Sequence, residues 1–192
     1  ENRILKLLKE NIDSINAIIL QDYNKGVISK RIISECIKLA NDNNKIITVD
    51  PKYLNFNEYK NVTIFKPNRK ETEDALGIRI NSETDLESAG RLLLEKLDAK
   101  YILLTMGEKG VALFEKGKDI FRLPTQARKA ADVSGAGDTV ISTITMALCA
   151  GAEIKEAAYL ANYAGGLVCE VTGIVPIDKD LLFKTIEDKN DD

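Results

Sequence analysis

The chain has 192 residues, of which 44% are hydrophobic and 30% charged, and its formal net charge is −3. These values predict a single globular domain over residues 1–192. The sequence has no basic block long enough to indicate a nucleic-acid-binding protein. No apolar run approaches the roughly 20 residues of a membrane-spanning helix, and no secretory signal is visible. We therefore expect neither nucleic acid nor a membrane as a partner, and a cytoplasmic location.

Histidine is absent from the sequence. Its absence excludes mechanisms that need an imidazole base, including the usual serine and cysteine triads. The three cysteines, Cys36, Cys149 and Cys169, are far apart, and each falls within a helical apolar pattern. We interpret them as small core side chains in a reducing compartment.

Strand-like and helix-like patterns alternate along the first half of the chain. Short continuous apolar runs, typical of buried strands, occupy residues 17–20, 46–49, 62–65 and 101–105. Helical patterns cover residues 2–11, 29–41, 68–76 and 82–97. Ser29 and Ser82 are candidate N-caps of two of these helices.

The pattern changes after residue 105. Residues 110–114 and 119–123 are separated by Lys116-Gly117-Lys118, which predicts a hairpin. Three more helices are predicted over residues 136–150, 154–171 and 178–187. The whole succession predicts an α/β fold with a mostly parallel sheet, right-handed crossovers and helices on both faces.

Polar and glycine-containing segments follow the ends of the predicted strands. They are residues 22–26, Asp50, residues 68–71 and residues 105–110. In open α/β sheets, ligands bind beyond the carboxyl ends of the strands. We therefore expect these segments to line one crevice.

The most informative segment is Asp132-Val133-Ser134-Gly135-Ala136-Gly137-Asp138-Thr139, which opens a long apolar helix. A Gly135-Ala136-Gly137 turn at a helix start presents backbone N–H groups to an anion. The neighbouring Asp138 is a candidate proton acceptor, although an acidic residue is also favoured there electrostatically, by about 0.3–1 kcal/mol. A dinucleotide-binding Gly-x-Gly-x-x-Gly does not fit, because its third glycine would fall on Val140.

Two further motifs each allow two interpretations. Asn68 and Glu71 stand three apart at a helix start, where they could hold Mg²⁺ through its waters or form an N-cap with its capping-box partner. Spacing alone favours neither. Thr105, Gly107 and Gly110 could offer hydroxyl and backbone donors to nucleotide phosphates, or simply form a glycine turn into the hairpin.

Together these segments resemble the ribokinase-type (PfkB) sugar kinase family. Residues 132–138 are similar to its C-terminal signature, Asn68-Arg69-Lys70-Glu71 fits its Asn-x-x-Glu element, and residues 105–110 fit its Thr-x-Gly-x-x-Gly element. Thr143 departs from the usual Ala or Gly of the signature. The resemblance implies a three-layer α/β/α ribokinase-like fold, ATP and Mg²⁺, with Asp138 as the base and residues 135–137 as the anion hole.

One subgroup is closer still. Residues 22–26, Lys66-Pro67-Asn68 and residues 131–152 are similar to the kinase domain of bacterial ADP-heptose synthases. This resemblance implies phosphorylation of D-glycero-β-D-manno-heptose 7-phosphate at C1, on the route to the lipopolysaccharide inner core. Asp22 and Lys25 resemble substrate-side residues, with Lys25 meeting the phosphate of the sugar or, alternatively, lying as an ordinary surface lysine in a turn.

Three residues are assigned to the adenine end of the nucleotide. Asn162 would lie near adenine together with Gly165 and Val175, and the alternative for Asn162 is a solvated helix position. The family also has an N-terminal third with opening strands, a small β lid and many sugar contacts, which nothing here matches. The chain thus resembles the C-terminal, nucleotide-binding part of such a kinase, with the N-terminal third and the β lid missing.

Three functions remain open at this point: a heptose phosphate kinase, another PfkB kinase of ribose or fructose type, and a nucleotide-binding module without turnover of its own. A parallel sheet that lacks its opening strands would expose an unpaired edge strand and apolar side chains to solvent. We therefore also expect the chain to form a homodimer.

Overall fold

The computed structural model describes residues 1–125 and 132–190. Its centre is a six-stranded sheet in which the strands follow one another in sequence order. The strands are β1 (Ala17–Gln21), β2 (Ile46–Asp50), β3 (Ile64–Phe65), β4 (Tyr101–Thr105), β5 (Val111–Glu115) and β6 (Phe121–Leu123). The first four pair in parallel, and β5 and β6 add an antiparallel hairpin, as the sequence predicts.

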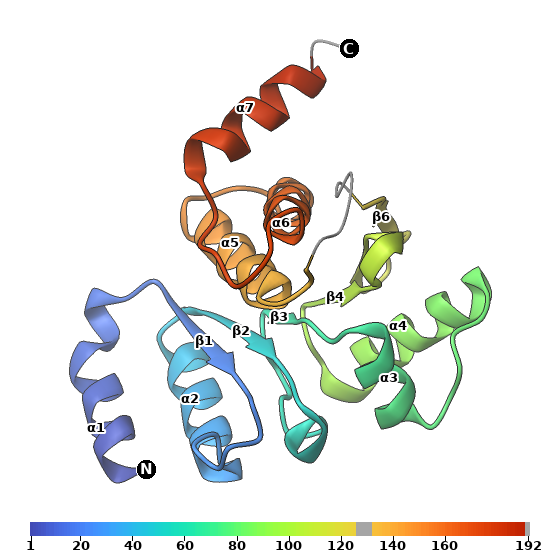
Figure 1. Ribbon diagram of the computed structural model, residues 1–192. Helices are drawn as coiled ribbons and strands as arrows, with labels where there is room; N and C mark the ends of the chain where they lie inside the picture. Colours follow the sequence, from blue (N-terminus) through green and yellow to red (C-terminus); the bar gives the residue numbers. More distant parts are fainter. Residues whose placement is uncertain (126–131, 191–192) are drawn as a thin grey trace.

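Helices cover both faces of this sheet (Figure 1). One face carries α1 (Asn2–Asn11), α2 (Lys30–Asp42), α3 (Arg69–Leu76) and α4 (Glu83–Leu97). The other carries α5 (Ala136–Cys149) and α6 (Ile154–Cys169), and α7 (Lys179–Asn190) packs on α6. The strands follow one another in one direction across the sheet. Right-handed crossovers between such parallel strands place their helices on the same face of the sheet. The chain reaches the opposite face only after the hairpin.

Side-chain caps fix where several helices begin. The Ser29 hydroxyl accepts a hydrogen bond from Ile32 N at the start of α2. Ser82 and Asp85 form a capping box at the start of α4. Each such cap satisfies first-turn N–H groups that have no partner within the helix and contributes about 1 kcal/mol.

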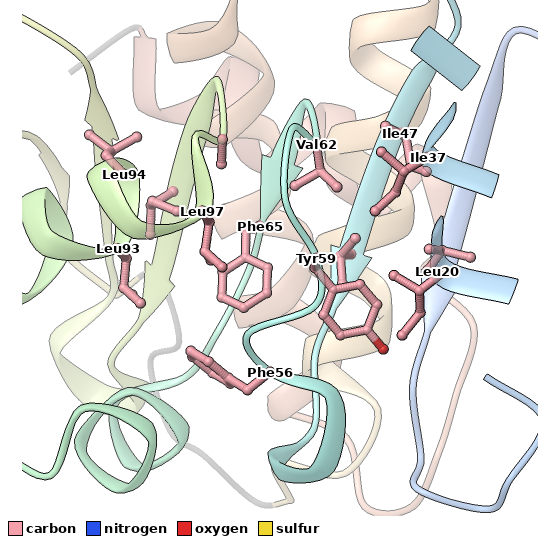
Figure 2. Packing of buried hydrophobic residues seen from close by; sticks show 14 of the residues in the cluster. Leu20, Ile37, Ile47, Phe56, Tyr59, Val62, Phe65, Leu93, Leu94 and Leu97 are labelled. Carbon is pink, nitrogen blue, oxygen red and sulfur yellow. The ribbon is translucent and has the colours of Figure 1, made fainter. Parts of the chain in front are cut away.

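The larger core lies between the sheet and the helices α1 to α4. Figure 2 shows Leu20, Ile47 and Phe65 from the strands facing Ile37 of α2 and Leu97 of α4. Phe56, in the segment between β2 and β3, closes this core: its ring is perpendicular to that of Phe65, with centroids 4.9 Å apart. Every second residue of each strand contributes its side chain to this core, as expected from the alternation of side chains along a β-strand.

The second core lies beneath α5 and α6 and fixes α5 over β1 and β2. Ile64 and Leu103 of the sheet pack there with Val140 and Ile144 of α5. A buried hydrogen bond of 2.8 Å joins the hydroxyl groups of Thr48 in β2 and Thr145 in α5. This packing brings the N-terminus of α5 to the carboxyl ends of the parallel strands.

The predicted α/β class with a mostly parallel sheet and helices on both faces is confirmed, with small differences at element ends. The third strand, β3, is shorter than the predicted residues 62–65 and covers only Ile64 and Phe65; just before it, Asn61 takes a left-handed conformation with φ of 60°. β6 begins at Phe121 instead of residue 119, and α6 ends at Cys169 instead of residue 171. In the described part of the chain, no helix is long and apolar enough to cross a membrane.

Gly90→Ala should destabilise the fold, although alanine is normally the better helix residue. A β-carbon at Gly90 would lie 2.3 Å from two ring atoms of Phe114, which is itself 2% exposed. We expect overpacking to lower the free energy of unfolding by about 1–3 kcal/mol in urea denaturation. Ser88→Ala, at an exposed position of the same helix, is the control. Equal stability of the two variants would show that α4 and β5 pack less closely.

Candidate active site

The first turn of α5 is the centre of the candidate site. Its N-cap, Gly135, has a φ of 80°, a conformation that favours glycine. A β-carbon added to Gly137 would lie 3.3 Å from Lys66 Nζ and 3.5 Å from Asp50 Oδ2. The backbone of residues 135–137, which we call the anion turn, therefore passes directly over the ends of β2 and β3. First-turn N–H groups and the positive end of the helix dipole point toward this end.

A buried ion pair lies under the anion turn. Lys66 Nζ is 3.0 Å from Asp50 Oδ2, and the two side chains are only 3% and 7% exposed. Gln21 Nε2, at the end of β1, donates to the same carboxylate oxygen at 2.9 Å. No motif in the sequence indicates this ion pair. The pair could have been inferred from two features of the sequence. Each of the three residues stands at or just after the end of a strand, and the two charged residues, on neighbouring strands, carry opposite charges.

Asp138 follows the anion turn in the first turn of α5, where its side chain is exposed. Its Oδ2 accepts a hydrogen bond of 2.8 Å from the hydroxyl of Tyr23, in the loop after β1. The hydrogen bond to the Asp138 carboxylate raises the pKa of Tyr23 above its ordinary value. Tyr23 lies in the segment of residues 22–26, and the sequence pattern indicates no role for it on its own.

Asn68 and Glu71 adopt the capping-box geometry at the start of α3. Asn68 Oδ1 accepts from Glu71 N at 2.8 Å, and Glu71 Oε2 accepts from Asn68 N at 2.8 Å. Glu71 Oε1 forms an ion pair with Lys52, which follows β2. The structural interpretation of this motif is thus realised, and the metal interpretation stays a prediction.

The same residues fit a magnesium ion by their chemistry. Carboxylate and amide oxygens are the hard ligands that Mg²⁺ prefers, and the ammonium of Lys52 already places a positive charge at Glu71. Among the described residues, no group of three or more His, Cys, Asp or Glu side chains could hold a metal. A Mg²⁺ ion here would therefore keep much of its water, as the sequence analysis expects.

A cavity of about 490 Å³ opens beside the anion turn, within the size range of small-molecule sites. It is formed by the β4–β5 connection, the start of α5 and the middle of α6. Its lining includes most of the predicted nucleotide residues: Thr105, Gly107, Gly110, Ala136, Gly137, Asn162 and Gly165. Cys169, predicted as a core residue, also lines it and is half-buried. Val175 does not belong to the described lining, and its nucleotide assignment stays a prediction.

Several of these lining residues also hold the cavity walls together. A β-carbon at Gly110 would lie 2.0 Å from the Leu123 carbonyl oxygen, and one at Gly165 would lie 2.6 Å from Val140 Cγ2. Asn162 is buried, and its Nδ2 donates to the Pro124 carbonyl at 2.8 Å. It is therefore not the solvated helix residue of the alternative interpretation.

Asp22 lies inside the protein, with 1% exposure. Its carboxylate accepts from Asn24 N at 2.7 Å, from the Tyr59 hydroxyl at 2.7 Å and from Asn55 Nδ2 at 3.2 Å. Burial and the hydrogen bond to Asp22 raise the pKa of Tyr59. The structure thus gives Asp22 an anchoring role, while Lys25 lies exposed in the same loop. Contacts of either residue with a sugar stay predictions.

Comparison with known proteins shows the family. The sequence model of the pfkB family carbohydrate kinases matches residues 4–179, so the chain belongs to that family. It is 40% identical over 186 residues to the bifunctional protein HldE of Desulfatibacillum aliphaticivorans, covering 97% of this chain and 38% of that protein. HldE of Geobacter sulfurreducens is 39% identical over 173 residues, covering 90% and 35%. The chain thus spans little more than a third of the length of these relatives.

Solved structures share the fold at lower identity. Arabidopsis thaliana ribokinase complexed with ribose and ATP superposes with a TM-score of 0.82 at 23% identity, covering 97% of this chain and 59% of that one. Escherichia coli phosphofructokinase-2 in complex with potassium gives 0.81 at 18% identity, covering 94% and 60%. These similarities establish a ribokinase-like fold.

Lys66→Met should strongly destabilise the chain, because it leaves the Asp50 carboxylate buried without its partner. We expect a loss of about 3–5 kcal/mol in the free energy of unfolding. The double variant Asp50→Asn/Lys66→Met should recover much of that loss in the same urea titration. Lys60→Met, at an exposed site, is the matched control. A loss in Lys66→Met no larger than in this control would contradict a buried, paired charge.

Proposed function

We propose that this chain forms the nucleotide side of an enzyme that transfers the γ-phosphoryl group of ATP to a hydroxyl of a sugar phosphate. One observation carries the proposal: the anion turn and the Asp138 carboxylate stand together at the edge of the cavity lined by Thr105, Gly107 and Gly110. This arrangement supports the assignment of a phosphate-binding element, a proton acceptor and a nucleotide site to one end of the sheet.

Phosphoryl transfer needs alignment, charge neutralisation and a destination for one proton. The nucleotide would occupy the cavity with its phosphates toward the anion turn, where backbone N–H groups and the helix dipole stabilise negative charge. Beneath Gly137 the Lys66 ammonium is paired with the Asp50 carboxylate, so this ion pair supports the turn from the sheet side without adding net charge. Asp138 would accept the proton of the attacking hydroxyl as the new P–O bond forms and ADP leaves. A carboxylate suffices if the proton leaves late in a loose transition state.

Asn68 and Glu71 are the residues that would hold Mg²⁺, with Lys52 giving up its contact with Glu71. When bound, the ion would neutralise charge that develops on the phosphate oxygens. The capping box does not exclude this role, because a carboxylate has more than one acceptor position on each oxygen.

For the acceptor we propose D-glycero-β-D-manno-heptose 7-phosphate, converted to the 1,7-bisphosphate in ADP-heptose and lipopolysaccharide core biosynthesis. Two HldE relatives at 39–40% identity support this choice, as does the exposed Lys25 in the loop beside Asp138 as a partner for the phosphate of the sugar. Proteins with this fold also include ribokinase and phosphofructokinase, which supports a ribose or fructose kinase as the second candidate. A cytoplasmic reaction would follow from the use of ATP.

A third candidate is a nucleotide-binding part that needs the rest of the enzyme for turnover. The chain spans 59–60% of the solved kinases that it matches. β1 is the edge strand of the described sheet, and Ile19 on it is 40% exposed. A homodimer formed along this edge remains a proposal, which the sedimentation behaviour of the chain would test.

Asp138→Asn in the full-length enzyme should lower kcat by about 10²–10⁴-fold, the usual contribution of a general base, while ATP affinity changes little. The measurement is coupled ADP release with heptose 7-phosphate, ribose and fructose 6-phosphate as acceptors. Asp74→Asn, at an exposed position of α3, is the matched control. Near-normal turnover of Asp138→Asn would remove Asp138 from the mechanism, and a higher kcat/KM for another sugar would reject the heptose assignment.

Glu71→Gln should reduce the gain in ATP affinity that Mg²⁺ provides. Glutamine keeps an acceptor for Asn68 N, so the helix cap survives while the charge is lost. In calorimetry on this chain, we expect the ratio of ATP affinities with and without Mg²⁺ to fall about tenfold, or about 1.4 kcal/mol. Asp85→Asn in the equivalent capping box of α4 should leave the ratio unchanged. An unchanged ratio in Glu71→Gln would reject this metal site.

A further inference from the structure

Tyr23 and Asp138 are 115 positions apart in the sequence, yet the Tyr23 hydroxyl donates to Asp138 Oδ2 at 2.8 Å. We propose that Tyr23 is a positioning residue, which orients the Asp138 carboxylate for proton transfer. This inference rests on the proposed role of Asp138 as proton acceptor. It gives a purpose to a loop residue that the phosphate, metal and nucleotide sites leave unused.

The backbone on both sides of Tyr23 is firmly held, although the side chain itself is 52% exposed. Asp22 N donates to the Asp50 carbonyl at 3.0 Å, and the Asp22 carboxylate accepts from Asn24 N at 2.7 Å and from the buried Tyr59 hydroxyl at 2.7 Å. The loop is tied again where Asn55 Nδ2 donates to the Ile28 carbonyl at 2.9 Å. Asp22 thus anchors the loop, and the next residue reaches across to α5.

The geometry leaves room for an acceptor alcohol. A carboxylate has two oxygens, and the phenol of Tyr23 donates to Oδ2. Within residues 1–125 and 132–190 no side-chain hydrogen bond to Oδ1 is seen, which leaves that oxygen for a substrate hydroxyl. Asp138 lies exposed at a helix start, where a short side chain can occupy several rotamers. A donor fixed on one oxygen selects one of these rotamers, which is the kind of placement on which catalysis depends.

Tyr23 is a donor here and not an alternative base. The hydrogen bond to Asp138 raises the pKa of Tyr23, so the phenol keeps its proton in the neutral range. The charged groups around the contact are Lys52, which follows β2, and the paired Asp50 and Lys66 beneath the anion turn. None of them replaces the directed donor that the phenol supplies.

Tyr23→Phe tests the role, because it keeps the ring and removes only the hydroxyl. In the full-length enzyme we expect kcat to fall about tenfold, with little change in the KM for ATP. Tyr53→Phe, at a tyrosine that is 68% exposed, is the control.

A double variant separates positioning from general structural support. If Tyr23 acts through Asp138, Tyr23→Phe should add almost nothing in an Asp138→Asn background. An equal loss of kcat in both backgrounds would overturn the proposal, and so would full activity of Tyr23→Phe.

A measurement on this chain checks the contact without any turnover. In an alkaline absorbance titration of tyrosinate, the difference between the native chain and Tyr23→Phe isolates Tyr23, and Asp138→Asn should lower the pKa of that phenol. An unchanged pKa would show that the contact does not persist in solution and would end the inference. If the contact persists but Asp138→Asn leaves turnover of the full-length enzyme intact, the proposed base fails and the positioning role fails with it.

Discussion

The buried ion pair between Lys66 and Asp50 is the interaction on which the site depends. It joins the ends of β2 and β3 with 3.0 Å between the charged atoms, directly beneath Gly137. Two charges taken out of water are costly to separate, because either one alone would remain buried and unpaired. The pair therefore holds the two strand ends in one arrangement, and a side chain at residue 137 of α5 would press on it.

The two faces of the sheet have different roles: one carries the larger core, and the other carries the cavity. The face covered by α1 to α4 carries the larger aromatic and aliphatic core (Figure 2) and acts as a rigid support. The opposite face carries α5 and α6, whose close approach at Gly165 forms one wall of the cavity. Chemistry is thus concentrated at one end of one face, where a helix N-terminus meets the carboxyl ends of parallel strands.

Several residues serve the fold and the proposed reaction at once. Glu71 caps α3 while it pairs with Lys52, and Asp22 anchors a loop that carries Tyr23 to Asp138. Asn162 ties α6 to the Pro124 carbonyl while it lines the cavity. The structural and functional interpretations of such residues do not exclude each other, since a residue that fixes a wall of a site is itself part of that wall.

The sequence alone determined the alternation of strands and helices, the caps at Ser29 and Ser82, the hairpin and the anion turn. These features depend on neighbours within a few positions, and hydrophobic periodicity and glycine spacing report such local order. The tertiary structure decided the pairing of Lys66 with Asp50, of Lys52 with Glu71, and of Tyr23 with Asp138. Those contacts depend on the register of neighbouring strands and on where α5 rests on the sheet. Side-chain packing between distant segments sets the register of the strands and the position of α5. No pattern of neighbouring residues in the sequence records this packing.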